Sequence, residues 1–172
     1  MKHYIFILTV FLYSLQSFAQ QDNYSFIKLI VLNNNDEVML VKWNGAWEIP
    51  GTRYNQPITI SKQIDTLAAE HGIFVQNKKL NGLFTFEYEN RPILTIMHYY
   101  TAFYEKGNFT IPKSCEDIGW FTIEKALSII PYQEMKLIIS KIIKNKNNLW
   151  GGGIKKWNDG NIEFLEEFYE LK

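Results

Sequence analysis

The residues Trp47-Glu48-Ile49-Pro50-Gly51 (WEIPG) decide the fold together with Glu70-His71-Gly72-Ile73 (EHGI). Proline and glycine interrupt regular structure, so WEIPG indicates the end of a strand and the start of a loop. Ile58–His71 predicts a helix because its apolar residues recur at helical spacing. These apolar residues are Ile60, Ile64, Leu67 and Ala68. Thr59 or Ser61 is the expected cap, and the glycine of EHGI is the expected end of the helix.

Strand-forming residues lie on both sides of this helix. Ser25–Leu32 is rich in β-branched and apolar residues and predicts a buried strand. Glu37–Trp43 predicts a second strand, and the Asn-rich turn between them favours a hairpin. After the helix, Gly82–Glu89 and Ile93–Glu105 predict two long strands on either side of an Asn-Arg-Pro turn.

The C-terminal part of the chain adds two helices and a hairpin. Thr122–Ile130 predicts a short helix, and Tyr132–Lys146 predicts a basic amphipathic helix whose charged face we interpret as solvated. Ile154–Trp157 and Ile162–Phe168 predict a closing hairpin, which follows a Trp-Gly-Gly-Gly turn at residues 150–153. Strands and helices are mixed rather than strictly alternating. The sequence therefore predicts an α+β or mixed α/β sandwich with helices that cover a central sheet.

Composition narrows the function classes. The chain has 172 residues, of which 47% are hydrophobic, and this length suits one folded domain. Its 18 basic and 18 acidic residues balance to zero net charge, so there is no electrostatic case for a nucleic-acid partner. The single cysteine, Cys115, excludes an internal disulfide and a cysteine-rich zinc site.

The first residues are typical of a secretory signal peptide. Lys2 precedes the apolar run Tyr4–Leu15, and the small residues Ser17 and Ala19 fit a cut after Ala19. The run is shorter than the roughly 20 apolar residues that span a membrane. We therefore expect residues 1–19 to be removed, and residues 20–172 to form one domain in the periplasm or outside the cell, without a membrane anchor. The alternatives are an uncleaved anchor and a buried strand.

The order of hairpin, WEIPG loop and amphipathic helix resembles the Nudix superfamily. That family carries a box written G-x5-E-x7-R-E-U-x-E-E-x-G-U, in which U is aliphatic. Laid from Gly51 to Ile73, the pattern has the correct total spacing, and the matching residues are Gly51, Leu67, Glu70, Gly72 and Ile73. In a second alignment Thr52 takes the place of the box glycine. Glu116–Ala126, in which an acidic residue precedes a Trp-Phe pair, resembles the late segment of the family.

The resemblance implies a Nudix-like α/β/α sandwich with a mixed central sheet and, as in some members, a C-terminal β-hairpin. It also implies an Mg²⁺ or Mn²⁺ cofactor, because such enzymes use metal-assisted hydrolysis of diphosphates. The box of this chain is degenerate. Pro57 stands at the loop glutamate, Asp65 at the arginine, and Thr66 and Ala69 at two of the helix glutamates.

The resemblance also implies a set of site residues, to which Asp65 is added as a displaced metal ligand. Glu70 and Asp117 are the candidate catalytic residues, and Glu70 and Asp65 are the candidate metal ligands. Gly51, Trp47 and Gly72 are the candidate binding residues. Further carboxylates that could be recruited are Glu48, Glu87, Glu89 and Glu116. For each of these acids the alternative is an ordinary exposed surface residue.

The remaining polar and aromatic residues point less directly to a site. We interpret His98 as a sheet histidine and Cys115 as an unreactive thiol, because neither has a partner set in the sequence. Several aromatic residues could stack on a nucleobase, although packing within the fold is the commoner role. They are Trp43, Trp47, Tyr54, Tyr88, Tyr99 and Tyr100.

Three functional hypotheses follow. The first is a Nudix-type hydrolase of a nucleoside-diphosphate-linked compound whose standard activity is weak or altered, because most box ligands are missing. The second is a non-catalytic ligand-binding or interaction protein built on the same fold. The third is an unrelated small secreted domain in which the WEIPG stretch is a coincidence. The sequence leaves the oligomeric state and the substrate open.

Overall fold

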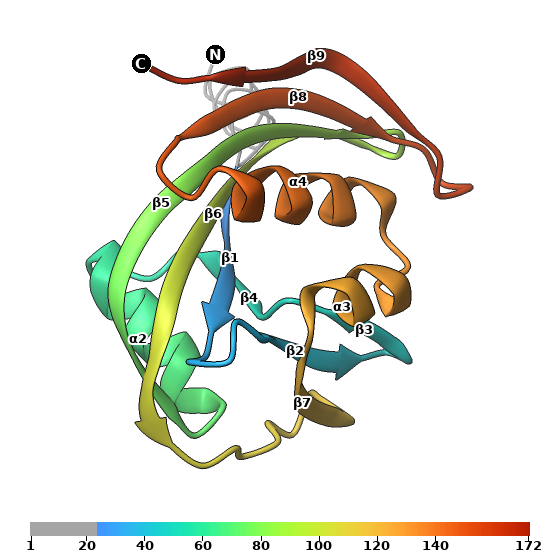
Figure 1. The fold of residues 1–172 in the computed structure, drawn as a ribbon. Helices are drawn as coiled ribbons and strands as arrows, with labels where there is room; N and C mark the ends of the chain where they lie inside the picture. Colours follow the sequence, from blue (N-terminus) through green and yellow to red (C-terminus); the bar gives the residue numbers. More distant parts are fainter. Residues whose placement is uncertain (1–23) are drawn as a thin grey trace, which may run out of the picture.

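The computed structural model describes residues 24–172, so the expected signal peptide of residues 1–19 lies outside the described part. The strands are β1 (Tyr24–Leu32), β2 (Val38–Trp43), β3 (Ala46–Glu48), β4 (Gly51–Tyr54), β5 (Ile73–Tyr88), β6 (Arg91–Gly107), β7 (Asp117–Phe121), β8 (Trp150–Lys156) and β9 (Ile162–Glu170). The helices are α2 (Ile60–Glu70), α3 (Ile123–Ile129) and α4 (Gln133–Lys144). Figure 1 shows their arrangement.

All these strands belong to one mixed sheet. Its order is β3-β2-β1-β6-β5-β8-β9, with β4 paired to β1 and β7 paired to β2. The pairs β1–β6 and β5–β8 are parallel, and the other pairs are antiparallel. The predicted mixed central sheet is therefore confirmed.

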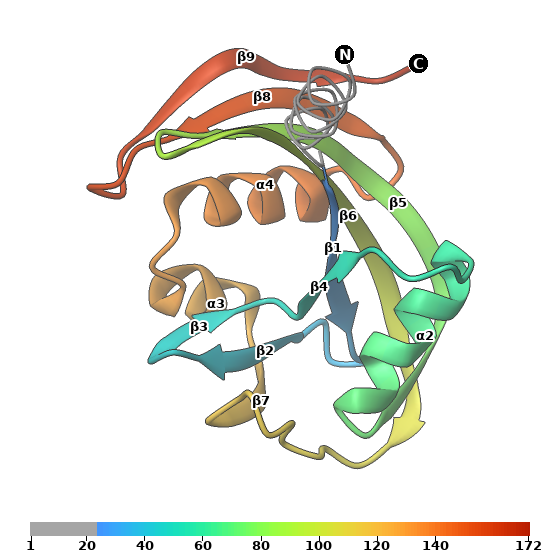
Figure 2. The same ribbon diagram turned by 180° about the vertical axis from the view of Figure 1, so that it is seen from behind.

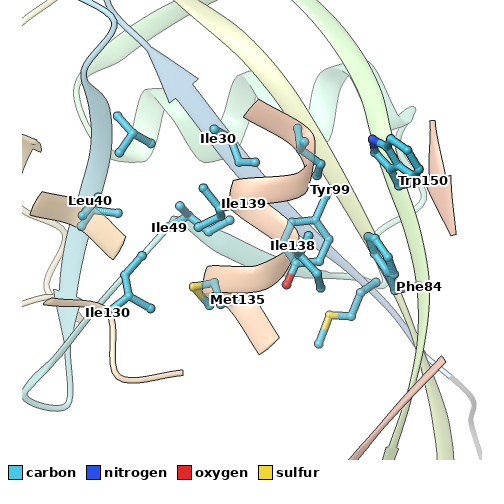
Figure 3. Packing of buried hydrophobic residues seen from close by; sticks show 14 of the residues in the cluster. Ile30, Leu40, Ile49, Phe84, Tyr99, Ile130, Met135, Ile138, Ile139 and Trp150 are labelled. Carbon is cyan, nitrogen blue, oxygen red and sulfur yellow. The ribbon is translucent and has the colours of Figure 1, made fainter. Parts of the chain in front are cut away.

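The helices cover both faces of the curved sheet. α2 packs on one face, whereas α3 and α4 lie on the other, inside the curve of β5, β6 and β8 (Figures 1 and 2). Ile138 and Ile139 of α4 are fully buried among strand residues in the larger core (Figure 3). The α/β/α sandwich expected from the sequence is confirmed.

The expected hairpin of β1 and β2 is only partly correct. The two strands pair antiparallel at Leu32 and Val38, next to the turn, and then diverge. β1 has no free edge for a longer hairpin, because β6 occupies one edge and β4 pairs with Ser25–Lys28 on the other. β2 pairs instead with β7 and β3.

The long strands β5 and β6 extend further than the sequence indicated. β5 begins at Ile73 rather than Gly82, because it absorbs several register shifts against β6. Asn77 adopts a positive φ of 53° within the register shift between Gln76 and Lys79. Such bulges break the alternation of polar and apolar residues on which strand prediction depends.

The closing hairpin is present, but its first strand begins earlier than expected. Residues 150–153 were interpreted as a turn and instead open β8. A Cβ atom at Gly151 would lie 2.8 Å from the Tyr169 ring, and one at Gly152 would lie 2.9 Å from Phe168. These glycines therefore allow the aromatic side chains of β9 to lie across β8.

The helices within residues 24–172 are too short or too polar to serve as a membrane span.

Candidate functional site

The end of α2 is fixed by its caps. The helix begins at Thr59, whose hydroxyl accepts a hydrogen bond from Lys62 N at 3.3 Å. It ends where Gly72, at φ 78°, turns the chain into β5. A Cβ at Gly72 would lie 2.2 Å from the Asn108 carbonyl oxygen. Gly72 is therefore required by the turn and by its close neighbour, and it does not line the cleft described next.

A cleft of about 370 Å³ opens beside the C-terminal end of α2. Its walls come from β1, the β2–β4 region, the end of α2 and the loop before β7. The lining residues are Phe26, Lys28, Val41, Trp43, Glu48, Pro50, Gly51, Thr52, Arg53, Leu67, Glu70, His71, Pro112, Ser114 and Cys115. Two of the residues singled out for the site, Gly51 and Glu70, are thus brought together in one cleft.

A buried ion pair lies in this cleft. Lys28 Nζ donates to Glu48 Oε2 at 2.7 Å and to the Ile49 carbonyl at 3.4 Å. The lysine is only 7% exposed. Burial lowers the pKa of Lys28, and the nearby Glu48 carboxylate opposes that shift. The pair therefore fixes a positive and a negative charge where solvent is largely excluded.

Gly51 brings the WEIPG loop against β1. A Cβ at this position would lie 2.7 Å from both Lys28 Cδ and a ring carbon of Phe26. The absence of a side chain therefore lets the loop pack on the lysine stem.

An adjoining recess of about 240 Å³ shares Phe26, Lys28, Trp43 and Glu48 with the cleft. Its other lining residues are Phe86, Tyr88, Met97, Tyr99, Tyr132, Glu134, Met135 and Lys156. Lys156 of β8 forms an ion pair with the buried Glu134 of α4. Burial raises the pKa of Tyr99 well above its usual value, and Glu134 adds to the effect, so its hydroxyl stays protonated. The recess is an aromatic cavity with two internal ion pairs.

His71 and Glu70 end α2 at the wall of the cleft. His71 Nδ1 lies 2.7 Å from the Leu67 carbonyl oxygen, which fits a neutral ring that donates from Nδ1. Burial lowers the pKa of His71, which favours that neutral form. Glu70 is exposed at the cleft. Of the described residues that line the cleft, Glu48 and Glu70 supply the carboxylates.

The second metal candidate, Asp65, lies elsewhere. Both of its carboxylate oxygens accept hydrogen bonds from Lys78 Nζ of β5, at 2.7 and 2.8 Å. Asp65 and Glu70 are separated by about 140° around the helix, at 100° per residue. The structure therefore does not bring these two candidate ligands together.

The late-loop acids and Trp47 also lie outside the cleft lining. Asp117 Oδ1 accepts from the backbone N–H of Ile118 at 2.8 Å. Glu116 accepts from Gly45 N at 2.7 Å. Trp47 stacks edge-on with Phe121 at a centroid distance of 4.9 Å. The lining tryptophan is Trp43, which is 44% exposed.

Solved structures provide a comparison of folds. The MutT protein from Bacillus halodurans is 19% identical and matches with a TM-score of 0.70, over 86% of this chain and 97% of its own. A NUDIX hydrolase from Nitrosomonas europaea is 15% identical, with a TM-score of 0.67 over 80% of this chain and 81% of its own. This chain has the Nudix fold.

A third Nudix structure carries a ligand. The NUDIX domain of Shewanella oneidensis NrtR, complexed with ADP ribose, is 14% identical and matches with a TM-score of 0.60, over 73% of this chain and 91% of its own. Neither the protein-family models nor the curated proteins gave a match to this chain. The likeness to Nudix proteins is therefore a likeness of fold.

The residues of this chain that align with the Nudix box do not fit a divalent-metal site. Hard cations such as Mg²⁺ require several oxygen ligands, usually carboxylates in close proximity. Within residues 24–172, no group of three or more His, Cys, Asp or Glu side chains is placed to hold a metal ion. Glu70 faces the cleft without Asp65, and Thr66 and Ala69 carry no charge.

Sequence reasoning missed Lys28 and Lys156. The available signal for Lys28 was a charged residue inside the otherwise apolar run Ser25–Leu32. A buried lysine is costly unless it is paired, so a lysine in a buried strand indicates a nearby partner such as a carboxylate. Lys156 gave no comparable signal, because it follows another lysine near an exposed turn.

Proposed function

We propose that this Nudix-fold domain binds a small molecule with a diphosphate linkage in the cleft beside Gly51 and Glu70. It hydrolyses that linkage far more slowly than a Nudix enzyme with a complete box. The observation that carries the proposal is the cleft itself, which opens where the box loop and the end of the box helix meet.

The two adjoining cavities suit a ligand with two unlike parts. The cleft contains the cationic residues Lys28 and Arg53, which are suited to a phosphate-bearing part. The adjoining recess is largely aromatic, so it suits a ring or another organic group. ADP-ribose, the ligand of the NrtR domain, has both parts and is a reasonable first probe.

Slow hydrolysis follows from the charges at the cleft. A carboxylate at the cleft wall can orient or deprotonate a water molecule, and Glu70 is the helix residue in that position. With the other box positions occupied by Pro57, Asp65, Thr66 and Ala69, Glu70 has no second box carboxylate at the cleft with which to hold a metal ion against the departing phosphate. We therefore expect binding to be measurable and turnover to be weak.

The test is to measure binding and turnover separately. Binding of ADP-ribose is followed by calorimetry, and product formation is followed by chromatography over a panel of nucleoside diphosphate derivatives with Mg²⁺ and with Mn²⁺. We expect weak turnover that is lost in Glu70→Gln, while binding persists. Failure to bind any compound of the panel, or turnover as fast as that of a Nudix enzyme with a complete box, contradicts the proposal.

A non-catalytic binding protein is the second candidate. It is favoured by the engagement of Asp65 with Lys78, which leaves Glu70 as the one box carboxylate at the cleft among the described residues. The same measurements separate the two candidates. Binding without any product, in the wild-type protein and in Glu70→Gln alike, favours the second.

We also propose that residues 1–19 direct export and are removed after Ala19. The support is the charge, apolar length and small-residue pattern of that segment. N-terminal sequencing of the protein recovered from the producing cells tests the cut. An intact Met1 in the exported fraction contradicts it.

A further inference from the structure

We propose that Lys28 and Arg53 hold the anionic group of the ligand directly, so that binding in this cleft does not require a divalent cation. The inference rests on the proposed function, namely that the cleft receives a phosphate-bearing molecule. It goes beyond that proposal because it names the groups that carry the charge and removes the metal from the binding step.

The charge balance of the cleft supports this. A site lined by several carboxylates repels a diphosphate unless cations neutralise it. Here the charged lining residues are Lys28, Arg53, Glu48 and Glu70, two of each sign. Because the walls carry their own positive charges, an anion can enter without an added cation.

The pairing of β1 with β4 places both cations on one side. Phe26 of β1 lies directly opposite Arg53 of β4, and Lys28 lies opposite Gly51. Directly opposite residues of an antiparallel pair share a face of the sheet, and so do residues two positions apart on a strand. Lys28 and Arg53 therefore project on the same face, and both line the cleft.

Lys28 is held in place before any ligand arrives. Its stem packs against Gly51, and its ammonium lies 5.4 Å from the centroid of the Phe26 ring. The ammonium has three N–H groups, and two of them are used by Glu48 and the Ile49 carbonyl. A third N–H group is left for a ligand oxygen. Such a fixed donor in a water-poor site loses little entropy on binding.

Arg53 complements this fixed donor. Arg53 lines the cleft and is exposed, whereas Lys28 is buried. A guanidinium offers a planar fork of donors that matches two oxygens of one phosphate. A diphosphate could therefore contact the exposed guanidinium at one end and the buried ammonium at the other.

The experiment measures ADP-ribose and inorganic pyrophosphate binding by calorimetry in excess EDTA and again in excess Mg²⁺. For ADP-ribose we expect dissociation constants that agree within about threefold between the two buffers. Lys28→Met should weaken binding in EDTA by about tenfold or more, because a charge-assisted hydrogen bond is lost. Lys78→Met, which removes a lysine paired outside the cleft, is the matched control and should leave binding unchanged.

Glu48→Gln supplies a test of opposite sign. The glutamate competes with the ligand for Lys28, so its neutralisation should tighten binding in EDTA several-fold. If the Lys28–Glu48 pair served only to stabilise the fold, both Lys28→Met and Glu48→Gln would weaken binding. If circular dichroism shows that Lys28→Met does not fold, Glu48→Gln and Arg53→Gln decide the question, with a gain and a loss expected respectively.

The outcomes separate this inference from the proposed function. Binding of ADP-ribose in Mg²⁺ but not in EDTA overturns the metal-free mode and leaves the proposed function intact. Binding in EDTA that Lys28→Met does not weaken also overturns it. No binding of either probe in both buffers counts against the inference and the proposed function together.

Discussion

Asp65 is anchored by Lys78, whose Nζ lies 2.7 and 2.8 Å from its two carboxylate oxygens. In the Nudix pattern this helix position holds an arginine. Here the charge is reversed, and its partner is a lysine of β5 rather than a residue of the box loop. The ion pair therefore joins α2 to the sheet and keeps the Asp65 carboxylate away from the cleft.

Asp65→Asn should leave ligand binding unchanged. The carboxylate does not line the cleft, and its side chain is 45% exposed, so the pair contributes at most about 1 kcal/mol to stability. Urea unfolding measures the stability, and calorimetry with ADP-ribose measures the binding. A large loss of binding in Asp65→Asn would show that Asp65 acts in the site after all.

Restoring the box glutamates should create a metal site. In the double variant Thr66→Glu and Ala69→Glu, carboxylates one turn apart on α2 would join Glu70 near the end of the helix. We expect Mn²⁺ affinity, measured by calorimetry, to rise at least tenfold over the wild type. Restoring Glu at 66 and 69 in a Glu70→Gln background is the control, and it should lose most of the gain. Unchanged affinity in the double variant would mean that these helix positions do not correspond to the box.

Gly72→Ala should destabilise the fold more than Gly160→Ala. Both glycines adopt a positive φ, 78° and 88° respectively, so each alanine costs about 1–2 kcal/mol of backbone strain. At Gly72 the new Cβ would also lie 2.2 Å from the Asn108 carbonyl oxygen, whereas at Gly160 it would meet nothing within 4 Å. Thermal and urea unfolding of the two variants give the comparison. Equal losses would disprove the close contact at Gly72.

Stability should fall on mild acidification, in part through His98. Burial lowers the pKa of His98, and a hydrogen bond to the Phe26 backbone only partly opposes this. Below the ordinary histidine pKa of about 6.5, the unfolded chain therefore binds more protons than the folded chain. The His98 contribution is fully present above that pH and is lost as the pH falls toward the folded pKa.

The variant His98→Gln isolates this contribution, because its amide nitrogen can take the place of Nε2 but does not titrate in this range. We expect its unfolding free energy to change less between pH 7.5 and 5.5 than that of the wild type. Some slope should persist, since burial also lowers the pKa of His71. Identical slopes in the two proteins would show that His98 is equally protonated in the folded and unfolded states.

The elements that sequence predicted well are those with regular periodicity and clear ends. The helix expected at Ile58–His71 is α2, capped by Thr59 as one of the two alternatives. The helices at Thr122–Ile130 and Tyr132–Lys146 correspond to α3 and α4. The strand expected from the sequence covers only the second half of β5, because the first half contains bulges. The short strands β3, β4 and β7 have too few residues to show a periodic pattern.

The site was harder to predict than the fold, because its walls come from distant parts of the sequence. Glu70 and Gly51 could be found from local spacing within the box. The partnership of Lys28 with Glu48, and of Glu134 with Lys156, depends on how β1, β3, α4 and β8 meet. A local sequence pattern cannot predict ion pairs between such distant elements. The zero net charge gives no sign of them either.

The parallel pairing of β1 with β6 has a consequence for how the chain is made. Every β1 residue from Tyr24 to Leu32 pairs with a partner between Thr95 and Phe103. Contacts between such distant segments slow folding, because a long loop must close before they form. A growing chain therefore cannot complete β1 until β6 has emerged from the ribosome. Until then, the edge of β1 that pairs with β6 stays open, while β4 can already pair with Ser25–Lys28 on the other edge.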